Sequence, residues 1–247
     1  MKALGSGKKG GIYFLSCLFG LMFACAHADG QLRDGLNLPD HDSKPYYLGI
    51  GFMYEQSHLQ VSANPKFLQS DSVLYVNPMN NGGFGVSGMF TFHVMDHLEF
   101  RVAFPEFIFA SNTLAYHVKY PPAGETQLAT KQIQSLLLGF PLHVKFLSDR
   151  IDNFRVYMMG GVNYQYDLAS NSSARKAQNL VKLSPSDFCA EIGIGFQFYF
   201  PVFILSPELK FSEGLKNVHD RDPNLQYSNV IDKLKSRMIV FSLIFEG

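Results

Sequence analysis

A few side chains in this sequence have types and spacings that could do chemistry. Gly83, Gly85 and Gly88 form the G-x-G-x-x-G string of dinucleotide-binding loops, and Ser173 with Lys176 forms the S-x-x-K string of a serine nucleophile. The first string binds a dinucleotide only where a strand precedes it and a helix opens on it. Here the glycines lie within an alternating segment, so small residues for close packing are the better interpretation. The second string lies in a polar loop, and we assign it no role.

Histidines offer the next candidates. His93 and His97 are four residues apart, a spacing that brings zinc ligands together on a helix, but they flank the tight turn of a predicted hairpin. His143 could be the base of a barrel enzyme acting on lipid or peptide, yet no serine or aspartate partner has a readable spacing. We therefore predict no catalytic residue, no metal and no cofactor, and keep a barrel enzyme as the alternative.

The element that positions these side chains is a β-strand of unusual length at residues 188–200. Every second residue from Phe188 is apolar, and the residues between are small or polar, among them Glu191 and Gln197. Successive side chains of a strand point to opposite faces, so one face is wholly apolar. Thirteen alternating residues exceed the roughly 5–6 of an average strand. They match the about 9–11 residues of a tilted strand that crosses a bilayer.

Seven further segments alternate in the same way, and they are separated by connections of two kinds. These strands are predicted at about 46–61, 83–94, 98–109, 135–146, 154–167, 203–211 and 239–245. Pro105 breaks the alternation of the third, which predicts a bulge. Long polar loops are predicted at 62–82, 111–131, 169–186 and 213–236, and short turns at 95–97, 148–153 and 201–202. The fold class is therefore an all-β, eight-stranded antiparallel transmembrane β-barrel with short periplasmic turns, long external loops and both termini in the periplasm.

The side chains that this alternation directs into the barrel carry mixed charges. They are Glu99, Arg101, His143, Lys145, Arg155, Glu191, Glu208 and Lys210. An eight-stranded barrel is only wide enough for side chains to fill, and unpaired buried charges are costly. We expect a paired polar network without chemistry, which argues against a diffusion pore. A lipocalin-like soluble barrel is the alternative, but its lumen is too small for so many phenylalanines.

The first 28 residues have the composition of a secretory signal peptide. Lys2, Lys8 and Lys9 make a basic start, residues 12–24 are mostly apolar, and residues 26–28 (AHA) offer a cleavage site. Acylation at Cys25, as in a lipoprotein, is the competing hypothesis. We expect residues 29–45 to be an extended periplasmic lead-in and residues 46–247 to form the barrel in the cell outer membrane.

Charge and cysteine content narrow the class of protein further. Without the first 28 residues the chain has 18 basic and 21 acidic residues, a net charge of −3. That balance argues against a nucleic-acid partner, which favours a basic surface, and no small-molecule substrate is indicated. Only Cys189 remains, so no intrachain disulfide is expected. The expected partners are outer-membrane lipid and other envelope proteins.

Several segments resemble one known family. Residues 134–170 (QSLLLGFPLHVKFLSDRIDNFRVYMMGGVNYQYDLAS), 186–215 and 227–246 look like the PorT family, also called SprT, of Bacteroidetes outer-membrane proteins, and the lead-in at 38–45 (LPDHDSKP) is similar too. The resemblance implies a component or assembly factor of type IX secretion, which exports proteases and gliding-motility adhesins. It implies no enzymatic activity. An outer-membrane barrel of the OmpX type, with a structural role, is a further alternative.

The segments that carry this resemblance include the lead-in and one short turn, so we expect partner contacts there. The candidate periplasmic contact residues are Leu38, Pro39, Asp42, Lys44, Asp149, Arg150, Asp152 and Asn153. The sequence names no partner for them.

Overall fold

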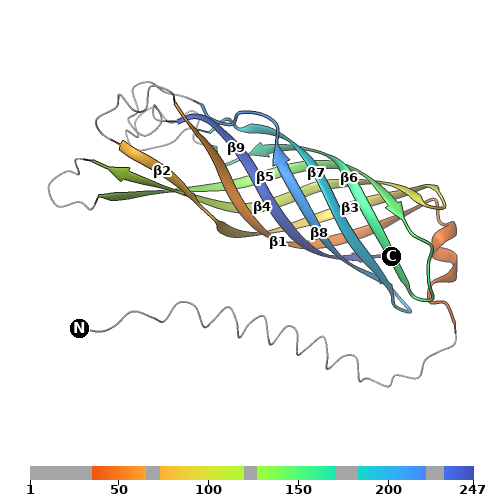
Figure 1. Ribbon diagram of the computed structural model, residues 1–247. Coiled ribbons are helices and arrows are strands. Elements are labelled where there is room, and N and C mark those ends of the chain that lie inside the picture. The colour runs from red at the N-terminus through yellow and green to blue at the C-terminus, as the bar shows by residue number, and fades with distance from the viewer. Residues whose placement is uncertain (1–34, 65–72, 120–126, 171–182, 221–230) are drawn as a thin grey trace, which may run out of the picture. The chain divides into compact units, whose positions relative to one another are not determined.

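The computed structural model describes residues 35–64, 73–119, 127–170, 183–220 and 231–247 (Figure 1). Residues 36–247 form one compact unit. The expected signal peptide and the Ser173–Lys176 string lie outside the described residues. In the described part of the chain, no helix has the length and apolar character that crossing a bilayer requires.

A short 3-10 helix and nine strands make up the described unit. The helix is η1 (Pro39–Ser43), and the strands are β1 (Tyr46–Ala63), β2 (Val73–Met79), β3 (Asn81–Met95), β4 (Leu98–Val118), β5 (Leu128–Leu147), β6 (Phe154–Asp167), β7 (Ser186–Tyr199), β8 (Ile204–Gly214) and β9 (Ile231–Glu246). The extended conformation predicted for the whole lead-in is wrong at η1, where the chain turns through a helix before it enters β1.

The strands close into a ring. Each strand pairs antiparallel with its neighbours in the order β2-β4-β3-β1-β9-β8-β7-β6-β5, and a further ladder between β4 and β5 joins the two sides. The ladder from Leu98↔Phe146 to His117↔Leu128 runs along nearly all of β4. Ladders join the strands all round the ring, as a barrel in hydrocarbon requires; within the described residues the exception is near the long-loop end, where no ladder joins residues 58–63 of β1 to β2. The predicted antiparallel barrel is therefore confirmed.

The nine strands occupy eight positions around this ring. β2 and β3 both pair with the same edge of β4, β2 with residues 113–118 and β3 with residues 98–109. The two strands are thus consecutive pieces of one wall element, and the prediction of eight strand positions holds. The predicted loops 62–82 and 111–131 are wrong in extent, because β2 lies in the first and the ends of β4 and β5 lie in the second.

Pro105 marks a bulge in β4, as predicted. The register of β4 shifts between Val102 and Glu106 on the β5 side. Residues 98–104 place their even-numbered side chains outward, whereas beyond the bulge Phe107 and Phe109 point outward and Glu106 is buried. One extra residue in a strand reverses the faces that follow it. The bulge is therefore what brings Glu106 into the lumen.

The three short connections, the start of β1 and the end of β9 lie at one end of the barrel, here called the short-turn end (Figure 1). The opposite end is called the long-loop end. At the short-turn end the terminal residues complete the seam between β1 and β9, where Gly247 and Leu48 exchange two backbone hydrogen bonds. The helix η1 lies at the same end.

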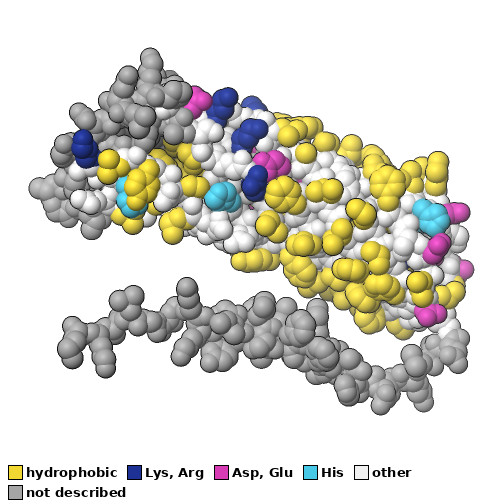
Figure 2. Space-filling model, viewed as in Figure 1, with side chains coloured by type: hydrophobic (Ala, Val, Ile, Leu, Met, Phe, Trp, Pro, Cys, Tyr) yellow, Lys and Arg dark blue, Asp and Glu magenta, His cyan; other side chains and the backbone are white. Residues whose placement is uncertain are grey.

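The outer wall of the barrel is apolar and aromatic. The outward side chains of β7 at positions 188, 192, 194, 196 and 198, and that of Phe200 just after the strand, are all at least a third exposed. Figure 2 shows hydrophobic side chains covering the visible wall between a group of charged side chains near the middle of the view and the few charged side chains at the short-turn end. A wall with this polarity suits lipid on the outside, the arrangement of outer-membrane barrels.

The apolar wall ends at the same level on three adjacent strands. On β1 the outward residues change from aromatic at Tyr54 to polar at Gln56 and His58. His58 pairs in register with Arg237 of β9, which in turn pairs with Glu213 of β8. Three neighbouring polar side chains therefore mark a boundary between the lipid-facing wall and the long-loop end.

Candidate functional site

The centre of the lumen is crossed by ion pairs between opposite walls. Arg101 Nη1 of β4 lies 2.7 Å from Glu208 Oε2 of β8, and Lys210 Nζ of β8 lies 3.4 Å from Glu106 Oε1 of β4. β4 and β8 are four positions apart in the ring of eight, so each pair spans the full width of the barrel. All four side chains are buried. These contacts obstruct the axis of the barrel.

A second layer of the network joins β5, β6 and β7. His143 Nε2 lies 2.6 Å from Glu191 Oε2, and Lys210 Nζ lies 3.1 Å from the same oxygen. The Asn163 amide donates to Glu106 Oε2 at 2.8 Å and to Glu191 Oε1 at 3.1 Å. Each of these two carboxylates therefore has more than one buried partner, as a buried charge requires.

A third layer lies closer to the short-turn end. Lys145 Nζ lies 2.7 Å from Glu99 Oε2, and the Tyr47 hydroxyl donates to the same carboxylate oxygen at 2.8 Å. The Lys145 ammonium also lies 4.4 Å from the ring centroid of Tyr157, within cation–π range. Glu246 connects this layer to the centre, because its Oε1 lies 4.0 Å from Lys145 Nζ and 2.9 Å from Arg101 Nη2.

All eight lumen residues selected from the sequence are buried and face inward. Seven of them belong to the central network, and Arg155 lies at the short-turn end instead. Among the members that this selection omitted are Tyr47, Glu106, Tyr157, Asn163 and Glu246. Strict alternation would have found four of these, whereas Glu106 becomes inward only through the bulge at Pro105.

The long-loop end of the lumen is closed by an apolar cluster. Its buried members are Leu59, Leu114, Tyr116, Leu183, Val218, Ile231 and Leu234. An isolated bridge between Leu183 and His219 ties two connections over this cluster. Between the cluster and the ionic centre lies a cavity of about 50 Å³, enough for a few water molecules. The lumen is therefore filled along its length in the described residues.

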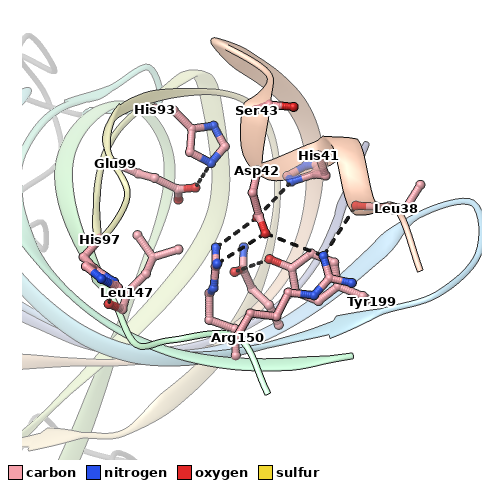
Figure 3. A network of polar contacts seen from close by, with 12 residues as sticks. Leu38, His41, Asp42, Ser43, His93, His97, Glu99, Leu147, Arg150 and Tyr199 are labelled. Atoms are coloured by element: carbon pink, nitrogen blue, oxygen red, sulfur yellow. Dashed lines mark hydrogen bonds and ion pairs between the residues drawn. The ribbon is translucent and has the colours of Figure 1, made fainter. Parts of the chain in front are cut away.

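The lead-in closes the short-turn end. Asn37 donates from its backbone N–H to Asn153 Oδ1 at 2.8 Å and from its side chain to the Tyr199 carbonyl at 2.9 Å. Asp42 accepts from Arg155 Nη1 at 3.1 Å. The helix η1 thus lies across the mouth, held to β6 and β7 and to the turn that precedes β6 (Figure 3).

Arg150 is the main anchor of the lead-in. Its guanidinium donates to the carbonyl oxygens of Asn37 and Leu38, and lies 3.7 Å from the ring centroid of Tyr199. Its Nη1 also lies 3.7 Å from Asp42 Oδ2. One arginine in the β5–β6 turn therefore binds both the backbone and a carboxylate of the lead-in.

This geometry separates the eight candidate contact residues into two groups. Arg150 and Asn153 bind the lead-in, and Asp42 accepts from the barrel, so the three are engaged within the chain. The exposed members are Pro39, Lys44, Asp149 and Asp152, while Leu38 is half-buried. The side chain of Asp149 is 93% exposed.

His41 of η1 is buried among aromatic rings. Its ring centroid lies 4.6 Å from that of Tyr47 and 6.1 Å from that of Tyr199. Burial lowers the pKa of His41 from 6.5 to about 4, so the imidazole is neutral at neutral pH. No sequence pattern pointed to His41, because the segment that forms η1 was predicted to be an extended lead-in.

The positions of the other sequence motifs in the barrel favour structural roles for them. Gly83 and Gly85 lie within β3, where an added Cβ would press on the carbonyl oxygens of Phe109 and Phe107 of β4. No helix follows them, so the dinucleotide interpretation has no structural basis. His97 lies in the β3–β4 turn with a 60% exposed side chain. His143 lies in the filled centre, 3% exposed, and its Nε2 is taken by Glu191.

The fold and the site together define a class: a closed β-barrel of the outer-membrane type with a filled lumen and a lead-in across its short-turn end. No family model and no curated protein matches the chain. Solved outer-membrane proteins are similar in fold. OprG of Pseudomonas aeruginosa is 14% identical with a TM-score of 0.48, covering 81% of this chain and 93% of that one.

Two further barrels are similar at comparable levels. The attachment invasion locus protein Ail of Yersinia pestis is 13% identical with a TM-score of 0.38, over 83% of this chain and all of that one. The outer membrane protease OmpT of Escherichia coli is 11% identical with a TM-score of 0.41, over 81% and 95% of the two chains. These values are too low to indicate a function.

Proposed function

We propose that this chain is a non-conducting outer-membrane barrel that serves type IX protein secretion, as a component or assembly factor, through contacts with other envelope proteins. In this proposal the short-turn end faces the periplasm. The filled lumen is the observation that supports the proposal that the barrel conducts no solutes. The secretion role rests on the resemblance of residues 134–170, 186–215 and 227–246 to the PorT family.

The filled lumen favours a role outside transport of solutes. Arg101–Glu208 and Lys210–Glu106 would both have to break before a solute could pass the centre. The apolar cluster and the lead-in would then have to leave the two ends. Three separate barriers of different chemistry suit a protein that acts through its outer surfaces.

The surface offered for such contacts is the set of turn tips at the short-turn end. Ile151 is 70% exposed and Val202 is 82% exposed, and the carboxylates of Asp149 and Asp152 flank Ile151. An apolar side chain between two acids is a small feature that a protein partner can recognise. The Asp152 carbonyl accepts from Arg150 Nε at 2.9 Å and the Asp149 carboxylate lies 3.7 Å from exposed His97 Nε2, so neither residue bonds to the lead-in as Arg150 and Asn153 do.

A deletion strain tests the secretion role. We expect loss of surface delivery of proteins that carry a type IX sorting domain, restored by the wild-type gene. Normal export of those proteins without the barrel would refute the role. The Asp149→Lys, Asp152→Lys double variant should restore export poorly while reaching the outer membrane in normal amounts. A lysine pair at Asp232 and Ser62, at the long-loop end, is the matched control.

A photo-crosslinking residue tests the contact surface. We expect covalent envelope partners from positions 149 and 202 and none from position 233 at the long-loop end. Partners identified by mass spectrometry that include no secretion component would count against the proposal, as would crosslinks only from position 233.

The alternative enzyme is tested through His143. His143→Ala should leave export of sorting-domain proteins intact whenever the variant folds, because the imidazole is internal. If a lipase or peptidase activity of the purified barrel disappears with that variant while export persists, the secretion proposal falls.

A further inference from the structure

Two histidines and an aspartate meet where the lead-in crosses the short-turn end. His41 and Asp42 come from η1, and His93 comes from β3 on the barrel wall. Each offers one ligand atom, and the three atoms lie within 4.8 Å of one another. Figure 3 shows Asp42 of η1 beside His41 and facing Arg150 of the β5–β6 turn. The sequence separates these histidines by about fifty positions, so only the fold assembles the group.

The imidazole of His41 has no partner that explains its burial. The residue is 2% exposed, and neither Nδ1 nor Nε2 has a hydrogen-bond partner among the described residues. The nearest carboxylate oxygen is Asp42 Oδ1, 4.0 Å from Nδ1. Buried polar groups in native proteins almost always have a partner. A side chain with two unpartnered nitrogens, fixed by the rings of Tyr47 and Tyr199, therefore points to a missing ligand.

His93 is already oriented by a carboxylate. Its Nε2 lies 3.0 Å from Glu99 Oε1, which leaves Nδ1 for another ligand. Metal-binding histidines usually direct their second nitrogen to a carboxylate in this way, which fixes the ring and strengthens it as a ligand. Glu99 is in turn held by Lys145 at 2.7 Å. The wall side of the cluster thus has the supporting contacts of a metal site.

We propose that His41, His93 and Asp42 bind one zinc ion, which fastens the lead-in to the barrel wall. Two imidazole nitrogens and one carboxylate oxygen are a ligand set that zinc accepts with a fourth, open position. Bonds of about 2.0–2.2 Å place tetrahedral ligand atoms roughly 3.4 Å apart, so the three side chains must close by rotation.

Two arginines compete with a metal ion for the Asp42 carboxylate. Arg155 Nη1 lies 3.1 Å from Oδ1 and its Nη2 lies 3.4 Å from Oδ2, and Arg150 Nη1 lies 3.7 Å from Oδ2. Oδ1 also lies 4.0 Å from His41 Nδ1, so zinc bound by Oδ1 takes the place of Arg155 Nη1 while Oδ2 keeps its arginine contacts. Glu99 supplies a second negative charge behind His93. The 37% exposed side chain of Asp42 gives the ion a route from solvent.

Calorimetric titration of the folded, chelator-treated barrel with zinc chloride in detergent tests the proposal. We expect one zinc per chain in the wild type. His41→Gln and His93→Gln should each weaken binding at least tenfold, and Asp42→Asn should weaken it less. His97→Gln is the matched control, because His97 is at the same end, exposed and outside the cluster. Gel mobility of unheated samples checks that each variant is folded.

Two further readouts separate a built site from surface binding. Cobalt in place of zinc should give the visible absorption of a tetrahedral site in the wild type and not in His93→Gln. Zinc should also slow proteolysis of the lead-in at least several-fold in the wild type and leave the rate in His93→Gln unchanged. Absence of stoichiometric binding, or a loss with His97→Gln as large as that with His93→Gln, would overturn the proposal.

Discussion

Arg101 and Glu208 form an ion pair across the whole width of the barrel, with 2.7 Å between Nη1 and Oε2. They come from β4 and β8, which are opposite one another in the ring. Without such pairs, the barrel would be held together only by the hydrogen bonds between neighbouring strands. Because this pair and Lys210–Glu106 join opposite walls, the cylinder is braced from inside.

Removing the guanidinium should therefore cost much stability. Arg101→Met leaves Glu208 and Glu246 buried without their main cationic partner, and we expect the free energy of unfolding to fall by about 3–5 kcal/mol. Urea unfolding in lipid vesicles, followed by far-UV circular dichroism, measures the change. Arg237→Met, in the exposed pair with Glu213, is the control and should leave the midpoint unchanged. Equal midpoints for Arg101→Met and wild type would contradict a bracing role.

Neighbouring glycines of β6 should respond differently to the same substitution. A Cβ at Gly161 would press on the carbonyl oxygen of Leu142 and lie 2.7 Å from His143 Cδ2, whereas at Gly160 its nearest neighbour is 3.9 Å away. Gly161→Ala should lower the free energy of unfolding by about 1–3 kcal/mol, and Gly160→Ala by less than about 0.5 kcal/mol. The same urea titration compares them. A larger loss of stability with Gly160→Ala than with Gly161→Ala would contradict the assignment of Gly161 to the lumen side and Gly160 to the outer side of β6.

The lipid-facing wall can be tested with a charge. Ile192 lies in the middle of β7 and is 58% exposed, so Ile192→Lys should cost about 2–4 kcal/mol in a bilayer. Ile151 is more exposed but lies in a turn, and Ile151→Lys should have little effect. The two variants are compared by unfolding from lipid vesicles. A tolerated lysine at position 192 would show that this wall is not in hydrocarbon.

The lead-in should come loose when its anchor is removed. Arg150→Ala deletes the donors to the carbonyls of Asn37 and Leu38 and the contact with Tyr199. We expect proteinase K to cleave residues 37–44 several-fold faster, with the unfolding midpoint of the barrel unchanged, because the strand ladders are intact. Mass spectrometry of the fragments gives the rate. The control is Asp149→Ala, at the neighbouring exposed residue, in which the lead-in should be cleaved at the wild-type rate. Equal cleavage rates in the two variants would show that Arg150 does not anchor the lead-in.

Much of the fold could be predicted from alternation alone. The apolar series in residues 188–200 fixes which face of β7 meets lipid, and the break at Pro105 fixes where β4 changes face. β2 could not be predicted, because Val73–Met79 is short, contains Pro78 and becomes a strand only by pairing with the end of β4. Local pattern carries little information where pairing decides the structure.

The site was less accessible to sequence reasoning. Alternation places Arg101 and Glu208 inside, but which charges meet depends on the stagger between strands, and no single strand encodes that stagger. The position of η1 depends on Arg150 and Arg155, more than a hundred residues away along the chain. His41 consequently gave no signal, although its neighbours in space include Tyr47, His93 and Tyr199.

The seam between β1 and β9 also determines an order of events. The first strand pairs with the last, from Gly49↔Glu246 to Ala63↔Ile231. Until β9 has formed, the backbone donors and acceptors along one edge of β1 therefore have no partner. An unpaired edge of that length is costly in hydrocarbon, so we expect a chain that ends before β9 to form no stable barrel in the membrane.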